Sequence, residues 1–153
     1  MNTVRTTPDV LEPRLGTGTE WVVDASGCCA DSLQDIALIR CICDQVVADI
    51  GVTVLGQPQF HRFGGPAGVT ALYMLSESHL ACHTYPEYGF ATFNLYCCRE
   101  RAAWNWQGVL SEKLDAKMVH VRHLARGVSQ DLAATSGSAG PGFNRFSEQG
   151  QDR

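Results

Sequence analysis

Apolar residues recur at helical spacing in two segments of the chain. Over residues 31–50 they return every three or four positions, at Leu33, Ile36, Ile39, Cys43, Val46, Val47 and Ile50. This spacing predicts one amphipathic helix, with Asp31 and Gln34 as a capping box at its start and Gly51 as its C-terminal cap. A second helix is predicted over residues 102–114, with its buried face formed by Trp106, Val109, Leu110 and Leu114.

Shorter apolar runs between glycines and prolines predict strands. They cover residues 21–25, 52–55, 59–63, 69–75, 79–84, 90–97 and 118–124. The order is then β-α-β-β-β-β-α-β, where the broken segment 52–63 counts as one strand. Strands joined by short turns pair antiparallel, so two helices must cover one face of the sheet. The predicted fold class is therefore α+β, a two-layer sandwich of an antiparallel sheet covered on one face by two helices.

The chain has 153 residues, which fits one domain. Residues 1–19 are polar, contain two prolines and are predicted to form a flexible N-terminal arm. Residues 127–153 are rich in Ser, Gly, Gln and Asp and are predicted to be a disordered tail. The folded domain is therefore expected over residues 20–126.

The composition excludes several classes of protein. The net charge is −4 and there is no basic run, which argues against nucleic-acid binding. No apolar run approaches the roughly 18 residues of a membrane span, and the N-terminus lacks the apolar stretch of a secretory signal. We therefore expect a cytoplasmic protein that binds neither membranes nor nucleic acid. The odd count of seven cysteines, without a secretory signal, argues against a disulfide framework. The cysteines include no C-x-x-C pair, so no zinc knuckle is predicted.

Reactive groups are concentrated in residues 75–87, which hold a Glu–Ser peptide bond, two histidines, a thiol and a second carboxylate. A serine hydroxyl can attack the preceding carbonyl where the backbone is strained and the oxyanion is stabilised. The resulting ester can break by β-elimination, and hydrolysis leaves a pyruvoyl ketone. Ser78 is the candidate for this attack, and the hydroxyl of Thr70 is expected to hold the carbonyl oxygen of Glu77.

Four blocks of the sequence resemble the small prokaryotic S-adenosylmethionine decarboxylases. They are FGGPAGVT at 63–70, ESH at 77–79, HTYPEYG at 83–89 and the cysteine at position 98. The resemblance runs over about residues 20–127, and it implies the S-adenosylmethionine decarboxylase-like fold. It also implies homodimers, with the sites near the interface between the two subunits.

The resemblance implies that the chain cleaves itself between Glu77 and Ser78, giving a β chain of residues 1–77 and an α chain of residues 78–153. Ser78 would become a covalent pyruvoyl cofactor. His83 would be the processing base that removes the Cα proton of Ser78. Thr70 stands where the family usually has a processing serine, and it keeps the hydroxyl.

The resemblance also implies roles in the decarboxylation of a small-molecule substrate. The substrate amine would form a Schiff base with the pyruvoyl ketone, which acts as the electron sink that a pyridoxal cofactor otherwise supplies. Cys98 would return a proton to the substrate carbon, because a thiol is largely protonated at neutral pH. Phe63 and Glu87 match a ring that stacks on the nucleoside and a carboxylate that binds the ribose. Tyr85 is a further substrate-facing position.

The sequence departs from the family pattern at substrate-facing positions. Tyr85 replaces the usual Trp of the HTWPE motif, and Asn94 replaces a common Asp. S-adenosylmethionine, as the precursor for spermidine synthesis, is the expected substrate. A basic amino acid such as arginine or ornithine is the first alternative. The second alternative is a paralogue that does not process itself and that binds or regulates an active partner.

Simpler interpretations exist for several of these residues. Glu87 could be a solvated turn residue and Phe63 a core residue, and His79 is interpreted as an ordinary strand histidine. Zinc held by histidines and cysteines is disfavoured, because counting by two along the strand puts Cys82 on the face opposite His79 and His83. No metal site is therefore predicted. The same alternation assigns Cys97 to packing and leaves Cys98 for the site.

Overall fold

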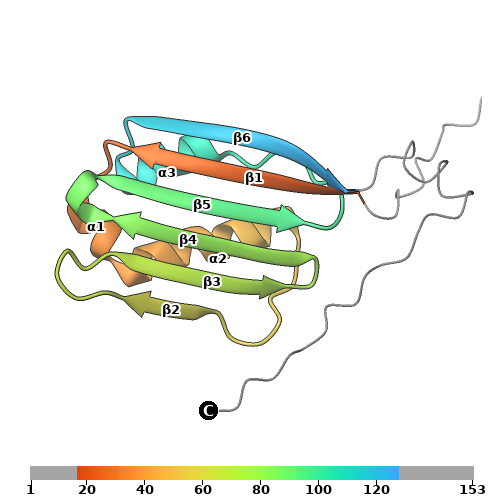
Figure 1. Cartoon of the computed structure of the whole chain (residues 1–153), viewed down its shortest axis with the longest axis horizontal. Helices are drawn as coiled ribbons and strands as arrows, with labels where there is room; N and C mark the ends of the chain where they lie inside the picture. Colours follow the sequence, from red (N-terminus) through yellow and green to blue (C-terminus); the bar gives the residue numbers. More distant parts are fainter. Residues whose placement is uncertain (1–16, 128–153) are drawn as a thin grey trace, which may run out of the picture.

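A computed structural model describes residues 17–127 of the chain (Figure 1). They form a six-stranded antiparallel sheet with the strand order β2-β3-β4-β5-β1-β6. The strands are β1 (Thr17–Ser26), β2 (Gln59–Arg62), β3 (Val69–Leu75), β4 (Ser78–Tyr85), β5 (Phe90–Cys97) and β6 (Met118–Gly127). The helices are α1 (Ala30–Gln34), α2 (Ile36–Ile50), the 3₁₀ helix η1 (Pro86–Tyr88) and α3 (Trp106–Leu114). The predicted α+β fold class is confirmed.

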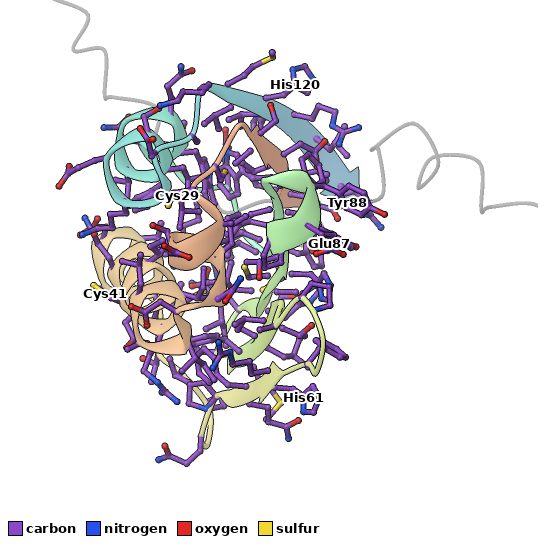
Figure 2. The ribbon with its side chains drawn as sticks, turned by 90° about the vertical axis from the view of Figure 1, so that its left-hand side faces the viewer. Cys29, Cys41, His61, Glu87, Tyr88 and His120 are labelled. Atoms are coloured by element: carbon purple, nitrogen blue, oxygen red, sulfur yellow. The ribbon has the colours of Figure 1, made fainter. Side chains whose placement is uncertain are left out.

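The two faces of the sheet have different environments. Helices lie behind one face, as Figures 1 and 2 show. The strand residues on that face are fully buried, among them Trp21, Tyr73, Leu80, Phe93 and Leu95. Alternate residues point to the other face, which no helix in the described part of the chain covers. We call this second surface the open face, and it carries the side chains of chemical interest.

The predicted helix over 31–50 is in fact two helices. The chain breaks at Asp35, whose backbone is extended and whose side chain accepts hydrogen bonds from the backbone N–H groups of Ala37 (2.8 Å) and Leu38 (3.1 Å). Asp35 is therefore the N-cap of α2, and the predicted capping box at Asp31 is wrong. The C-terminal cap is confirmed, because Gly51 has a left-handed backbone with φ 70°.

Other boundaries also differ from the prediction. The second helix begins only at Trp106, because the side chain of Asn105 caps it by accepting a hydrogen bond from Gly108 N–H (3.1 Å). Residues 52–55 form no strand, and Val54 makes a single isolated bridge to Leu75. Strand β1 starts at Thr17, so residues 17–19 belong to the sheet rather than to the predicted arm.

The rest of the predicted arm and nearly all of the predicted tail, residues 1–16 and 128–153, lie outside the described residues. Within residues 17–127, none of the helices is both long enough and apolar enough to cross a membrane. The expected cytoplasmic location stays a prediction.

The Asp35 cap gives a first test of the fold. We expect Asp35→Ala to lower the free energy of unfolding by about 1 kcal/mol, because two N–H groups at the start of α2 lose their acceptor. Urea unfolding followed by circular dichroism measures the change. Asp31→Ala is the matched control and is expected to cost less. An equal loss in both variants would contradict the assignment of the cap.

Candidate functional site

Two groups of functional residues lie at different positions along β4. The cleavage-site cluster contains Glu77, Ser78, His79, Asn94 and Cys98. The aromatic cluster contains Phe63, Thr70, His83 and Tyr85. Strand register explains both groups. Ser78 pairs with Leu75 on β3 and with Cys97 on β5, whereas His83 pairs with Thr70 and Thr92.

The backbone at Ser78 is strained. Ser78 follows a tight turn between β3 and β4 and has φ 134°. Residues with a Cβ atom rarely adopt positive φ, because the side chain then crowds the backbone. Strain of this kind raises the energy of the intact Glu77–Ser78 linkage relative to a product in which it has broken.

The carbonyl of the same linkage has a hydrogen-bond donor in place. The backbone N–H of Cys98 donates to the carbonyl oxygen of Glu77 at 2.8 Å. If a nucleophile attacked this carbonyl, the negative charge would develop on the oxygen that Cys98 already contacts. Cys98 therefore lies next to the Glu–Ser bond, while the side chain of Cys97 is buried on the helical side. The predicted opposite orientation of the two thiols is confirmed.

An ion pair fixes the side chain of Glu77. Arg101 donates from Nε to one carboxylate oxygen at 2.9 Å and from Nη2 to the other oxygen, and its Nη1 donates to the carbonyl of Ile50 at 3.3 Å. Hydrogen bonding to Glu77 raises the pKa of the Arg101 guanidinium. This two-point contact holds the residue before Ser78 against the end of α2.

His79 belongs to a chain of polar contacts on the open face. Its Nδ1 lies 3.1 Å from Oγ of Ser78, and its Nε2 lies 3.1 Å from Oδ1 of Asn94. Asn94 Nδ2 donates to Oε1 of Glu20 at 2.8 Å, and Arg126 pairs with the other oxygen of Glu20. The interpretation of His79 as an ordinary strand histidine overlooked these partners.

The aromatic cluster is centred on His83. Thr70 Oγ1 lies 2.5 Å from Nδ1 of His83. The ring of Tyr85 has its centroid 4.5 Å from that of His83, and the ring of Phe63 has its centroid 5.5 Å away. Phe63 is 45% exposed, so it is not a core residue, and one side of this cluster is available to a flat ligand.

The two clusters are too far apart to act together within one chain. His83 lies five residues beyond Ser78 on β4, which at roughly 3.3 Å per residue is about 16 Å. The expectation that Thr70 holds the carbonyl of Glu77 is wrong for a single chain, because antiparallel register pairs Thr70 with His83. The carbonyl oxygen of Glu77 instead accepts a hydrogen bond from the backbone N–H of Cys98.

Glu87 lies at the same end of the sheet as the aromatic cluster. It is exposed in η1, directly after β4. Figure 2 shows Glu87 and Tyr88 on this turn, on the side away from Cys29 and Cys41. No hydrogen bond of the described residues engages its carboxylate, which leaves it available to a ligand hydroxyl.

The thiols differ in burial and in pKa. Burial raises the pKa of Cys97 to about 11 and raises that of Cys82 well above its ordinary value. Hydrogen bonds from Ser32 lower the pKa of the exposed Cys29 thiol. Among the described residues, no group of three or more His, Cys, Asp or Glu side chains could hold a metal ion.

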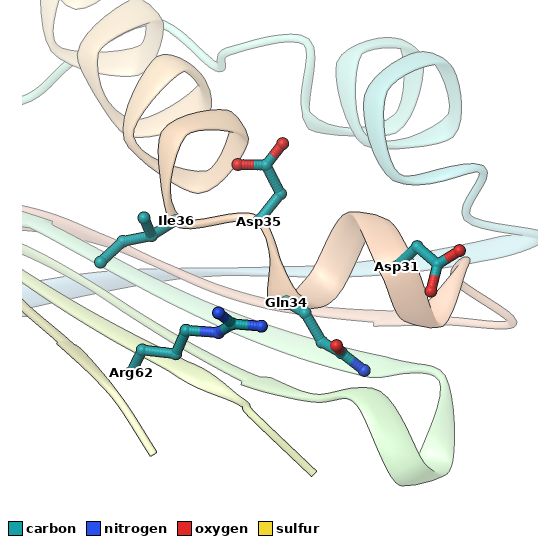
Figure 3. Close-up of a pocket in the computed structure, with 5 residues that line it drawn as sticks. All are labelled: Asp31, Gln34, Asp35, Ile36 and Arg62. Atoms are coloured by element: carbon teal, nitrogen blue, oxygen red, sulfur yellow. The ribbon is translucent and has the colours of Figure 1, made fainter. Parts of the chain in front are cut away.

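A separate hollow of about 320 Å³ lies on the helical side of the sheet (Figure 3). Its lining residues are Asp31, Gln34, Asp35, Ile36 and Arg62. It contains no member of either cluster, and the carboxylate of Asp35 is already engaged in capping α2. The hollow is therefore not the reactive site.

The layered α+β arrangement is shared with a solved structure. The crystal structure of the adenosylmethionine decarboxylase from Aquifex aeolicus VF5 aligns over 74% of this chain and 93% of its own, with a TM-score of 0.60 and 23% sequence identity. At this level of identity the likeness shows the fold.

Sequence comparisons define the family. The family model described as S-adenosylmethionine decarboxylase matches residues 19–127. The S-adenosylmethionine decarboxylase proenzyme of Moorella thermoacetica is 35% identical over 120 residues, covering 78% of this chain and 94% of that protein. The proenzyme of Thermotoga maritima is 37% identical over 111 residues, covering 72% and 84%. The chain belongs to the S-adenosylmethionine decarboxylase family.

The thiol environments predict a selective reaction with iodoacetamide. We expect Cys29 to be alkylated fastest in the folded protein near neutral pH, because its lowered pKa gives it the larger thiolate fraction. Cys82 and Cys97 should stay unmodified, because burial both shields them and raises their pKa. Peptide mass spectrometry measures each site, with urea-unfolded protein as the control. Equal rates at Cys29 and Cys97 in the folded chain would contradict these environments.

Proposed function

We propose that this protein is a self-processing, pyruvoyl-dependent S-adenosylmethionine decarboxylase. The main observation behind the proposal is the local geometry of the Glu77–Ser78 peptide bond. Ser78 has a strained backbone, and the carbonyl of Glu77 already accepts a hydrogen bond from Cys98. Family membership and the naming of the relatives as proenzymes support the same conclusion.

Processing follows from these groups in three balanced steps. The hydroxyl of Ser78 attacks the carbonyl carbon of Glu77, the C–N bond breaks, and an ester and a free amine result. Loss of the Cα proton of Ser78 then expels the carboxylate of Glu77 and leaves a dehydroalanine. Water adds to the imine form of this residue, ammonia leaves, and the pyruvoyl ketone remains on the new N-terminus.

The pyruvoyl group fits this site, because Ser78 supplies its atoms and the backbone N–H of Cys98 contacts the same linkage. When formed, the group supplies the electron sink for loss of CO₂. Cys98 then donates a proton to the substrate carbon. The product would serve as the aminopropyl donor for spermidine synthesis.

The aromatic cluster supports a nucleoside-bearing substrate. Phe63 is exposed enough to stack on a purine, and Tyr85 extends the aromatic surface across His83. The free carboxylate of Glu87 lies just beyond Tyr85 in the sequence and can accept hydrogen bonds from ribose hydroxyls.

The separation of the two clusters supports a homodimer. The processing base must reach the Cα of Ser78, and His83 of the same chain is about 16 Å away along β4. We infer that His83 of the partner subunit acts on Ser78. The open face suits this contact, because it carries large exposed apolar side chains, among them Leu72, Met74, Met118 and Leu124.

Face-to-face packing of two open faces explains how the clusters would meet. Consider a two-fold axis that lies between the two sheets and runs perpendicular to the strands. It reverses the direction of each strand in the copy, so the Ser78 end of β4 in one subunit lies over the Tyr85 end of β4 in the other. Each dimer would then hold two sites, each built from one cleavage-site cluster and the partner's aromatic cluster.

A decarboxylation assay tests the proposed reaction and the proton donor. We expect CO₂ release from carboxyl-labelled S-adenosylmethionine, and none from arginine or ornithine. Cys98→Ala should still cleave itself, but its turnover should fall by roughly 10²-fold or more, because protonation of the product loses its donor. Cys41→Ala, another exposed thiol, is the control. Full activity of Cys98→Ala would refute its assignment as the proton donor. CO₂ release from arginine alone would refute S-adenosylmethionine as the substrate.

Co-expression tests whether the site is shared between subunits. We expect His83→Ala to remain uncut alone and to be cut at Ser78 when co-expressed with a tagged Ser78→Ala chain, which supplies His83 in mixed dimers. A Ser78→Ala chain that also carries His83→Ala is the control and should give no rescue. Mixed dimers in which His83→Ala stays uncut would show that His83 acts on its own chain.

A further inference from the structure

We propose that His79 is the base that activates Ser78 for the first step of self-processing, through a proton relay formed by Ser78, His79, Asn94 and Glu20. The inference rests on the proposed function. It assigns the ester-forming step to a different histidine from the one that removes the Cα proton.

The hydrogen-bond directions along the relay fix the tautomer of His79. The carboxylate of Glu20 only accepts hydrogen bonds, so Asn94 must present its NH₂ group to Glu20 (2.8 Å). Its carbonyl oxygen Oδ1 then faces Nε2 of His79 at 3.1 Å and also only accepts. Nε2 must therefore carry the proton of a neutral His79.

The lone pair of Nδ1 is consequently directed at Ser78. In this tautomer Nδ1 is an acceptor, and it lies 3.1 Å from Oγ of Ser78. This is the geometry of a nucleophile hydrogen-bonded to a base, with the base oriented by a third group. Among residues 17–127, His79 is the histidine with a hydrogen bond to the Ser78 hydroxyl.

Glu20, at the far end of the relay, carries a negative charge. The hydrogen bond from Asn94, together with Arg126, lowers the pKa of Glu20. Glu20 is therefore a carboxylate at neutral pH, and its negative charge stabilises the imidazolium that forms as His79 takes the proton from Ser78. Asn94 carries the contact from His79 onward to Glu20, so one amide side chain separates His79 from the negative charge.

The proton that leaves the Ser78 hydroxyl stays within the cleavage-site cluster. Nδ1 of His79 takes the proton of the Ser78 hydroxyl while Oγ bonds to the carbonyl carbon of Glu77. The N–H of Cys98 holds the oxyanion. As the C–N bond breaks, the imidazolium returns the proton to the departing nitrogen of Ser78. His79 ends neutral, and no further reactant is needed.

His83 is poorly placed for this step. Its Nδ1 is engaged by the hydroxyl of Thr70 at 2.5 Å, whereas the hydroxyl of Ser78 lies 3.1 Å from Nδ1 of His79. The two histidines therefore divide the processing: His79 forms the ester, and the partner's His83 eliminates it.

Hydroxylamine separates these two roles, because it cleaves esters and leaves peptide bonds intact. We will follow pulse-labelled full-length chains made by cell-free translation. His83→Ala should accumulate a hydroxylamine-sensitive ester at position 78. His79→Ala should keep a hydroxylamine-resistant amide and should cleave roughly 10²- to 10⁴-fold more slowly than wild type. Added imidazole should accelerate His79→Ala, which a structural role would not permit.

Two further variants guard against misfolding and general damage. Asn94→Leu retains His79, removes the acceptor for its Nε2 proton and should slow the same ester-forming step. Cys41→Ala changes an exposed residue of α2, away from both clusters, and should cleave like wild type.

Each outcome decides one claim. If His79→Ala cleaves at the wild-type rate, accumulates the ester, or is slow but does not respond to imidazole, His79 is not the base. If His79→Ala does not fold, wild-type cleavage by Asn94→Leu has the same meaning. A wild-type chain that never cleaves would refute the proposed function itself rather than this assignment.

Discussion

The chemistry of this protein depends on the register of β3, β4 and β5. The tight turn that pairs Leu75 with Ser78 gives Ser78 its positive φ. The β4–β5 register then places Cys97 opposite Ser78 and lets the next residue, Cys98, donate its N–H to the carbonyl of Glu77. A slip of one residue in the β4–β5 pairing would take the N–H of Cys98 away from this carbonyl and would turn the side chains of the slipped strand to the opposite face of the sheet. The strained backbone of Ser78 and the hydrogen bond to the carbonyl of Glu77 therefore follow from one pairing.

The same register divides the site. It places His83 with Thr70, Phe63 and Tyr85 well along β4 from Ser78. A single chain thus carries the Glu77–Ser78 bond in one cluster and the proposed substrate-binding aromatic surface in another. Within residues 17–127, no helix covers the open face of the sheet (Figure 1). A second subunit that covers this face would complete both sites at once and would exclude water from the reacting groups.

The sequence pattern predicted the α+β sandwich, because short apolar runs lie between turn residues and the apolar residues of the helical segments repeat every three or four positions. It failed where a polar side chain decided the boundary, as at Asp35 and Asn105, whose caps are visible only in three dimensions. The resemblance predicted Ser78, His83 and Cys98. The five-residue separation of Ser78 and His83 along a predicted strand already implies that the two side chains lie apart, but only the register showed that Thr70 pairs with His83. The ion pair of Arg101 with Glu77 and the hydrogen bond of Asn94 with Glu20 join residues that are distant in sequence. No local sequence pattern could predict these contacts. The only sequence signal for the relay was the histidine directly after Ser78.

Intact mass spectrometry of the freshly purified protein tests the central claim, that the Glu77–Ser78 linkage converts itself into a ketone. The account predicts two fragments, one ending at Glu77 and one starting at position 78. The second should be lighter than a serine-initiated fragment by the mass of one ammonia, and borohydride should reduce it. A single chain of 16.7 kDa that stays whole on prolonged incubation and carries no reducible carbonyl would contradict the account.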